Sequence, residues 1–108
     1  AKIHAIVEDV VEASHNGITS WEIKSRVQPI LLQGKDDYIK TKERWIIFEE
    51  YFNKNNIKFK KITSIEGDII SKLVNLIYIL DYASIYLAII NKIDPTPVKS
   101  IDYIKKRL

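Results

Sequence analysis

The chain has 108 residues, of which 46% are hydrophobic and 29% are charged, as in an ordinary soluble domain and unlike a disordered segment. Because it contains no cysteine, disulfides, zinc–thiolate sites and a cysteine nucleophile are excluded. The net charge of +3 is small and the lysines mix with apolar residues, so we expect no nucleic-acid partner. The chain lacks methionine and begins at alanine, and we therefore expect it to be a piece of a longer protein.

The first predicted element is a helix over residues 3–13, because apolar residues recur there at steps of three and four. The residues of this stripe are Ile3, Ile6, Val7, Val10 and Val11. We expect Gly17 to end the helix, since glycine readily adopts the positive φ that closes one. Residues 18–26 fit either a short turn or one helical turn around Trp21.

Two apolar segments in the middle of the chain are typical of strands. Residues 27–32 form a compact apolar run before Gln33 and Gly34, which predicts a buried strand leading into a loop. In residues 57–62 apolar residues alternate with lysines, which predicts a second, less buried strand.

Two helices follow these strands in turn. The first is predicted to start at Asp36 and Asp37, which suit an N-cap and first turn, and to reach about Asn53. The second is predicted from residue 69 to about residue 92 and is apolar nearly all round. Such a helix is buried in a large core, in an oligomer interface or in a membrane.

The alternation of helices and strands with short links favours an α/β domain with parallel strands joined by right-handed crossovers. Two strands are too few for a complete sheet of this kind, so we expect the sheet to be completed elsewhere. Residues 73–90 are long enough to span a membrane, but Asp81 near their middle would cost about 2.5 to 3.5 kcal/mol there. We therefore expect the long helix to be buried in protein, with no membrane partner.

Two motifs stand at opposite ends of the chain. Residues 94–98 contain one Asp and two prolines, a combination that predicts the end of one helix and the start of another. This motif lies between the mostly apolar residues 81–88 and a short amphipathic tail over residues 101–108. Near the N-terminus, residues 14–18 read Ser-His-Asn-Gly-Ile and are followed by Trp-Glu at 21–22. Together these ends resemble the bifunctional phosphoglucose/phosphomannose isomerases, which are built from sugar isomerase (SIS) domains.

The resemblance implies that residues 1–108 are the C-terminal part of a three-layer αβα, flavodoxin-like SIS domain with parallel strands and a long buried helix. It implies a homodimeric, cytoplasmic enzyme of glycolysis or gluconeogenesis that interconverts fructose 6-phosphate with glucose 6-phosphate and mannose 6-phosphate. It implies no cofactor and no metal. The remaining SIS regions would precede this chain and carry the phosphate pocket, and the richness in isoleucine and lysine fits a thermophile or an AT-rich genome.

Three residues receive roles from the resemblance. His15 resembles the histidine that opens the sugar ring in the neighbouring subunit's site, chemistry that suits an imidazole near neutral pH. Lys105 resembles a C-terminal lysine that reaches the sugar and can steady developing negative charge, although the adjacent Lys106 leaves the register open. Thr96 would line the same pocket. For each of them a solvated surface residue is the alternative, and His4, which matches no motif, is expected to be solvated or at the core edge.

The chain departs from the family pattern at two points. Gly17 stands where the isomerases tend to have Glu, and the glutamate that moves the proton between C2 and C1 would fall immediately before Ala1. Glu8 and Glu12 lie on the polar side of the first helix and are not expected to replace that base. We therefore expect the isolated chain to be inactive.

Two other classes of protein stay open. A non-catalytic SIS-like module for sugar-phosphate binding or dimerisation is favoured by Gly17 and by the missing base. A small membrane-associated protein is the third interpretation, which the long apolar helix suggests.

Overall fold

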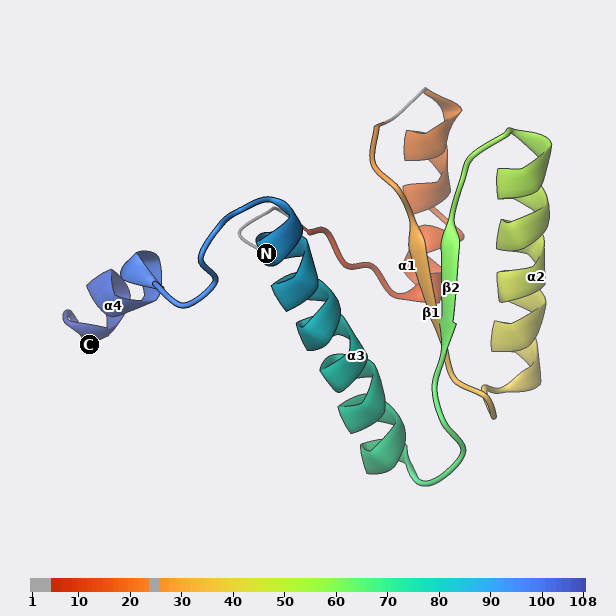
Figure 1. Ribbon diagram of the computed structural model, residues 1–108. Helices are drawn as coiled ribbons and strands as arrows, with labels where there is room; N and C mark the ends of the chain where they lie inside the picture. The colour runs from red at the N-terminus through yellow and green to blue at the C-terminus, as the bar shows by residue number, and fades with distance from the viewer. Residues whose placement is uncertain (1–4, 24–25) are drawn as a thin grey trace. The chain divides into compact units, whose positions relative to one another are not determined.

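The computed structural model describes residues 5–23 and 26–108 (Figure 1). The described residues divide into two compact units: one is Ile6–Leu76, and the other contains Ala5 and Ile77–Leu108. Ile3 and His4, which belong to the predicted first helix, lie outside the described residues.

The unit Ile6–Leu76 is built on a two-stranded parallel sheet. Strand β1 (Ile30–Gln33) pairs with β2 (Lys60–Thr63), with Ile30 opposite Lys60 and Gln33 opposite Thr63. Helix α2 (Ile39–Lys54) connects the strands and runs beside them (Figure 1). A helix between two neighbouring strands leads naturally to parallel pairing. The predicted α/β arrangement with parallel strands is therefore confirmed for this pair.

A small aromatic core joins the sheet to α2. Leu31 of β1 and Phe48 and Phe52 of α2 are buried, and Phe52 is only 1% exposed. The ring of Trp21 meets the ring of Phe52 edge-on at a centroid distance of 5.5 Å. Trp21 belongs to a 3-10 helix, Gly17–Glu22, so the helical turn that the sequence allowed around this tryptophan is present.

Helix α2 starts later than predicted, and neither aspartate caps it. Its N-cap is Tyr38, without a side-chain hydrogen bond. Asp37 instead accepts hydrogen bonds from the Gly34 N–H (2.9 Å) and from the Trp45 indole (3.2 Å). Asp36 accepts a hydrogen bond from Lys72 (2.8 Å), and this bonded cation lowers the pKa of Asp36.

The first helix is much shorter than predicted. Helix α1 covers only Val10–Ala13, because the Asp9 side chain accepts hydrogen bonds from the N–H groups of Val11 (2.9 Å) and Glu12 (3.1 Å) and so caps the helix there. Gly17 does not close this helix with a positive φ. It begins the 3-10 helix that follows, which corrects the prediction for this glycine.

Helix α3 (Ile69–Ile90) begins where the sequence predicted. Asp68 accepts hydrogen bonds from the Ser71 N–H (2.9 Å) and the Ser71 hydroxyl (3.0 Å), and these bonds lower the pKa of Asp68. At the other end Lys92 has a φ of 55°, and the Ile93 N–H donates to the Ala88 carbonyl at 2.9 Å. This six-to-one bond after a left-handed residue is the Schellman stop of a helix.

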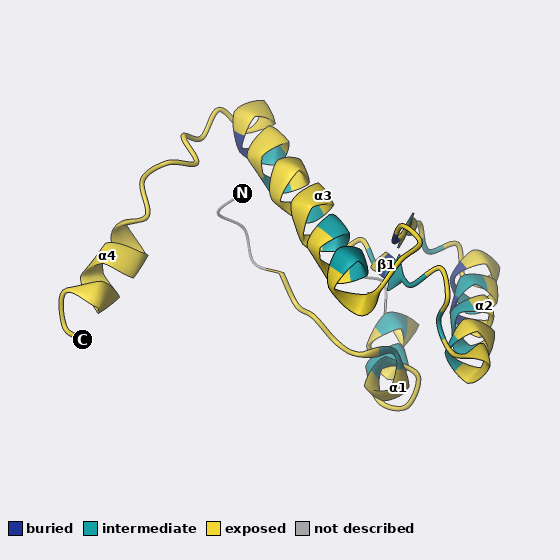
Figure 2. Cartoon of the chain, turned by 90° about the horizontal axis from the view of Figure 1, so that it is seen from below, coloured by how far each residue is buried: buried dark blue, intermediate teal, exposed yellow. Residues whose placement is uncertain are grey.

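The long helix, for which we expected burial in a protein core or an oligomer interface, is not buried by the residues of this chain alone. Only Ala88 of α3 is buried, and Figure 2 shows the helix mostly in the colour of exposed residues. A helix that is apolar nearly all round needs cover on several sides, and 108 residues with two short strands are too few to provide it. The last helix of the chain is α4 (Lys99–Lys105). Its N-cap is Val98, the residue that follows the second of the two prolines.

Candidate active site

His15 lies on the turn between α1 and the 3-10 helix. Its side chain is exposed, and its backbone N–H donates to the Glu12 carbonyl at 3.0 Å. The neighbouring Asn16 donates from its amide to the Glu12 carboxylate at 2.7 Å. The backbone of this turn is thus held by hydrogen bonds, and the imidazole is accessible to solvent.

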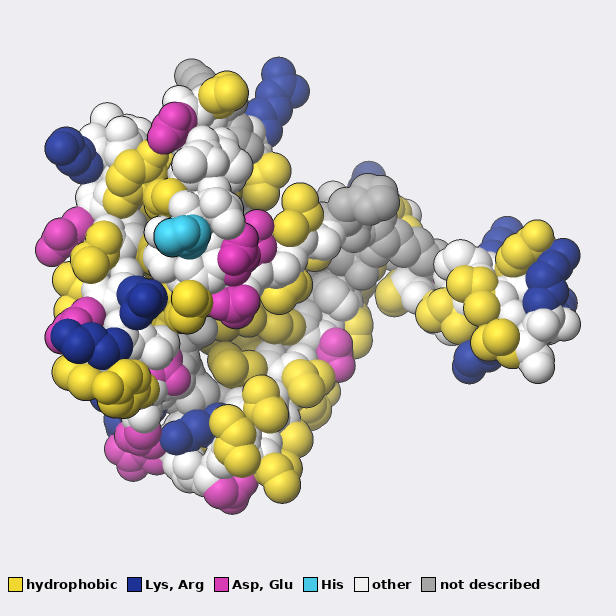
Figure 3. Space-filling view, turned by 180° about the vertical axis from the view of Figure 1, so that it is seen from behind, with side chains coloured by type: hydrophobic (Ala, Val, Ile, Leu, Met, Phe, Trp, Pro, Cys, Tyr) yellow, Lys and Arg dark blue, Asp and Glu magenta, His cyan; other side chains and the backbone are white. Residues whose placement is uncertain are grey.

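Two carboxylates lie close to this histidine turn. Glu12 bonds Asn16 as described, and the Glu8 carboxylate lies against Gly17, where it would meet a Cβ at that position. Figure 3 shows acidic side chains beside the histidine on the face seen from behind. A side chain at position 17 would displace the carboxylate end of Glu8, which is exposed and flexible.

Thr96 and Lys105 both belong to the unit that contains residues 77–108. The Thr96 N–H donates to the Asp94 carboxylate at 2.9 Å, which fixes the turn after the long helix. Lys105 is the last residue of α4, and its side chain is exposed. Within the described residues of this unit, no hydrogen bond joins Thr96 to Lys105. His15 belongs to the other unit, Ile6–Leu76.

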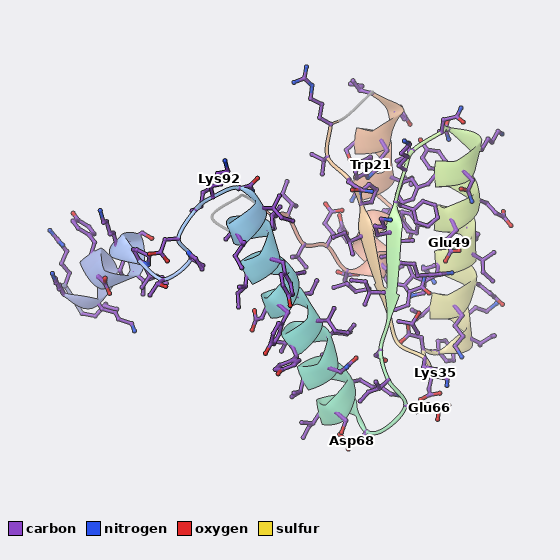
Figure 4. The ribbon with its side chains drawn as sticks, viewed as in Figure 1. Trp21, Lys35, Glu49, Glu66, Asp68 and Lys92 are labelled. Carbon is purple, nitrogen blue, oxygen red and sulfur yellow. The ribbon has the colours of Figure 1, made fainter. Side chains whose placement is uncertain are left out.

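A recess that the sequence analysis did not identify lies at the carboxyl ends of the two strands. Its volume is about 250 Å³, and its walls include the strand ends Gln33 and Thr63 together with Trp45 and Glu49 of α2. This edge is where α/β sheets usually bind ligands. Lys35, which also lines the recess, points toward Glu66 and forms an ion pair with it (Figure 4).

Three polar side chains of this recess, Gln33, Glu49 and Lys61, bond one another. Lys61 contacts both oxygens of Glu49, at 2.8 and 2.9 Å, and Gln33 donates to the same carboxylate at 3.0 Å. Burial raises the pKa of Glu49, but the hydrogen bonds from Lys61 and Gln33 outweigh it and leave the pKa lowered. The network ties α2 to both strands, so its first role is structural.

The lowered pKa of Glu49 predicts an acid-sensitive contribution to stability. A carboxyl group with a lowered folded-state pKa stabilises the fold above its ordinary value of 4.5 and loses this contribution as the pH falls through the lower folded-state value. We expect Glu49→Gln to cost up to about 1 kcal/mol at pH 7 and less below pH 4. Urea unfolding at several pH values measures this. The exposed neighbour Glu50 provides the control, and an equal effect of Glu50→Gln would contradict the assignment.

Within residues 5–23 and 26–108, no group of three or more His, Cys, Asp or Glu side chains could hold a metal ion. Helix α3 is long and apolar enough to cross a membrane, with 6% of its most apolar stretch buried. Length and composition alone are weak evidence, because core helices of soluble proteins meet the same criterion.

The parallel strands and the helix that connects them place the unit Ile6–Leu76 among parallel α/β domains. A family model described as the bacterial phospho-glucose isomerase C-terminal SIS domain matches residues 1–108. The chain therefore belongs to this SIS-domain family, as its two end motifs predicted.

A curated relative agrees with the family match. The chain is 31% identical over 101 residues to the bifunctional phosphoglucose/phosphomannose isomerase of Caldicellulosiruptor bescii, an alignment that covers 90% of the chain. The same alignment spans 30% of that relative's length. No solved structure matches the chain.

Proposed function

We propose that this chain is the C-terminal part of an aldose–ketose isomerase that interconverts fructose 6-phosphate with glucose 6-phosphate and mannose 6-phosphate. The observation that carries the proposal is the 31% identity to a bifunctional isomerase over 90% of the chain. The enzyme is cytoplasmic, and it acts on sugar phosphates without a metal or cofactor.

In this proposal His15 opens the sugar ring. It gives a proton to the ring oxygen as the anomeric hydroxyl loses one, which leaves an open-chain carbonyl compound. A carboxylate outside this chain then moves a proton between C2 and C1 through an enediol. The exposed imidazole on a fixed turn supports the role of His15. Lys105 steadies negative charge on the enediol oxygens, and Thr96 lines the sugar pocket.

The rest of the enzyme completes both the fold and the site. The two strands belong to a three-layer αβα domain whose other strands precede this chain, and residues 1–108 are the C-terminal part of that domain. The enzyme is a homodimer, so that His15 serves the site of the neighbouring subunit. The coverage of only 30% of the relative supports the need for a preceding region.

Turnover measurements test the proposal. The longer protein is expected to convert fructose 6-phosphate into both glucose 6-phosphate and mannose 6-phosphate, each detected by a coupled dehydrogenase assay. The pure 108-residue chain is expected to give no turnover, because its base and phosphate pocket lie elsewhere. Turnover by the 108-residue chain would overturn the missing-base argument, and a longer protein that binds the sugar phosphates without converting them would indicate the non-catalytic module, which the Gly17 departure favours.

A further inference from the structure

Asn16 and Gly17, which directly follow His15, form a chemically labile pair. The backbone nitrogen of the residue after an asparagine can attack the carbon of the side-chain amide, and asparagine is a thermolabile residue for this reason. A Cβ on the following residue hinders the attack, whereas glycine has none. The Asn16 side chain is also exposed to the water that the reaction consumes.

The attacking atom in this pair is the backbone nitrogen of Gly17. Gly17 is the first residue of the 3-10 helix, where an N–H group has no partner within the helix. In the described part of the chain, residues 5–23 and 26–108, no other group accepts a hydrogen bond from it. The nearest backbone bond of the turn runs from the Thr19 N–H to the Asn16 carbonyl, at 3.2 Å.

Two features of the turn slow this attack. The Asn16 amide donates to the Glu12 carboxylate at 2.7 Å, and the backbone of Asn16 has φ −108° and ψ −43°, from which it must rotate before a five-membered ring can close. Both features belong to an exposed turn, and such turns open far more often than a core does. Because Gly17 has no Cβ, it offers little steric resistance to the rotation. Ring closure therefore needs the turn to open but does not need the domain to unfold.

We propose that Asn16–Gly17 is a site of spontaneous deamidation. The Gly17 nitrogen forms a bond to the side-chain amide carbon of Asn16, the C–N bond of that amide breaks, and ammonia leaves with the proton that Gly17 loses. Water then opens the resulting succinimide ring at one of its two carbonyl carbons. The product is aspartate or isoaspartate, in which the main chain runs through the side-chain carbons. Water is the only co-reactant.

Deamidation removes one contact of the turn that carries His15. A carboxylate at position 16 cannot donate to Glu12, and two negative charges four residues apart repel one another. Isoaspartate also adds one carbon to the main chain next to His15. The chemistry at Asn16 is independent of the proposed function, whereas a resulting loss of isomerase activity rests on it.

The test follows Asn16 in the longer protein by peptide mass spectrometry, with chromatographic separation of the aspartate and isoaspartate peptides. The matched control is Asn55, which is exposed and donates from its amide to the Tyr51 carbonyl, four residues earlier, at 2.8 Å. Asn55 is followed by another asparagine instead of glycine. At mildly alkaline pH we expect Asn16 to convert at least about tenfold faster than Asn55, with isoaspartate among its products.

Gly17→Ala tests the attacking nitrogen. The backbone at Gly17 does not have a positive φ, and an added Cβ meets only the flexible carboxylate end of Glu8, so the variant should keep the fold. We expect it to slow the conversion of Asn16 by about tenfold or more, because the methyl group hinders both the attack and the rotation.

Three results would overturn the proposal. They are conversion of Asn16 no faster than that of Asn55, an unchanged rate in Gly17→Ala, and a product that is aspartate alone, which direct hydrolysis of the amide gives. Mass spectrometry detects the conversion equally well in an inactive protein. A failure of the proposed function and a failure of the proposed modification are therefore distinguishable.

Asn16→Asp tests the consequence for the turn. In the longer protein it is expected to raise the unfolding equilibrium constant by about two- to tenfold, because the hydrogen bond to Glu12 is lost. Adding Glu12→Gln supplies a donor opposite the new carboxylate and should return the constant to within about twofold of the unchanged protein. Denaturant unfolding measures all three proteins, and a double variant no more stable than the single one would overturn the link between deamidation and the histidine turn.

Discussion

Replacing His15 by alanine in the longer protein is expected to lower kcat for the conversion of fructose 6-phosphate by about 100- to 10,000-fold, the usual contribution of a positioned acid–base group. The thermal midpoint should stay within about 1 °C of the unchanged protein, because the imidazole is exposed and the turn is held by backbone bonds. Coupled assays and thermal unfolding measure the two quantities.

The proposed role of His15 is ring opening, and this role can be separated from a general loss of activity. A fructose 6-phosphate analogue without the 5-hydroxyl cannot close a furanose ring, so His15→Ala should slow its conversion far less. His4→Ala is the matched histidine control and should leave both rates unchanged. Equal losses on the ring-forming and open-chain substrates would assign His15 to another step.

Periodicity predicted those elements whose residues carry a strong and continuous pattern. Helix α3 starts at Ile69 directly after Asp68. Each strand is shorter than predicted, covers only the later part of its apolar segment and ends one residue beyond it, at Gln33 and at Thr63. Parallel pairing followed from the helix between them, because the topology leaves few other solutions. These features depend on many side chains acting together, so one atypical residue does not alter them.

The ends of elements depend on local competition that spacing does not reveal. Asp37 looked like an N-cap, but in the structure its carboxylate binds the Gly34 N–H and the Trp45 indole. Ile6 and Val7 continue the apolar stripe of the first helix, yet the helix starts only after Asp9. In each case the hydrogen bonds of a single aspartate side chain determine where the helix begins.

The candidate site shows a different limit of the sequence. His15 was found from its immediate neighbours, and the structure adds the nearby Glu8 and Glu12 carboxylates, which the sequence placed only on the polar side of a helix. The recess at Glu49 was missed because its residues come from separate elements and share no motif. The exposure of α3 was missed because a pattern identifies apolar residues but not the surface that covers them.

Phe52→Ala is expected to destabilise the domain by about 3 to 5 kcal/mol, the range for removing a buried aromatic side chain. Phe52 is 1% exposed, and its ring lies 5.7 Å from that of Phe48 and 5.6 Å from that of Phe59. The substitution removes the side chain through which α2, β1 and the Trp21 turn contact one another.

Phe52 connects the turn that follows His15 to the sheet. Its loss should therefore lower the stability of the domain and also loosen the turn that positions His15. Chemical denaturation of the longer protein measures the free energy of unfolding, with Lys54→Ala, exposed on the same helix, expected to change it by less than about 0.5 kcal/mol. Phe52→Leu keeps much of the volume and should cost less than the alanine variant. If Phe52→Ala cost no more than Lys54→Ala, the aromatic cluster could not be what holds the histidine turn against the sheet, and the fixed geometry proposed for His15 would lose its physical basis.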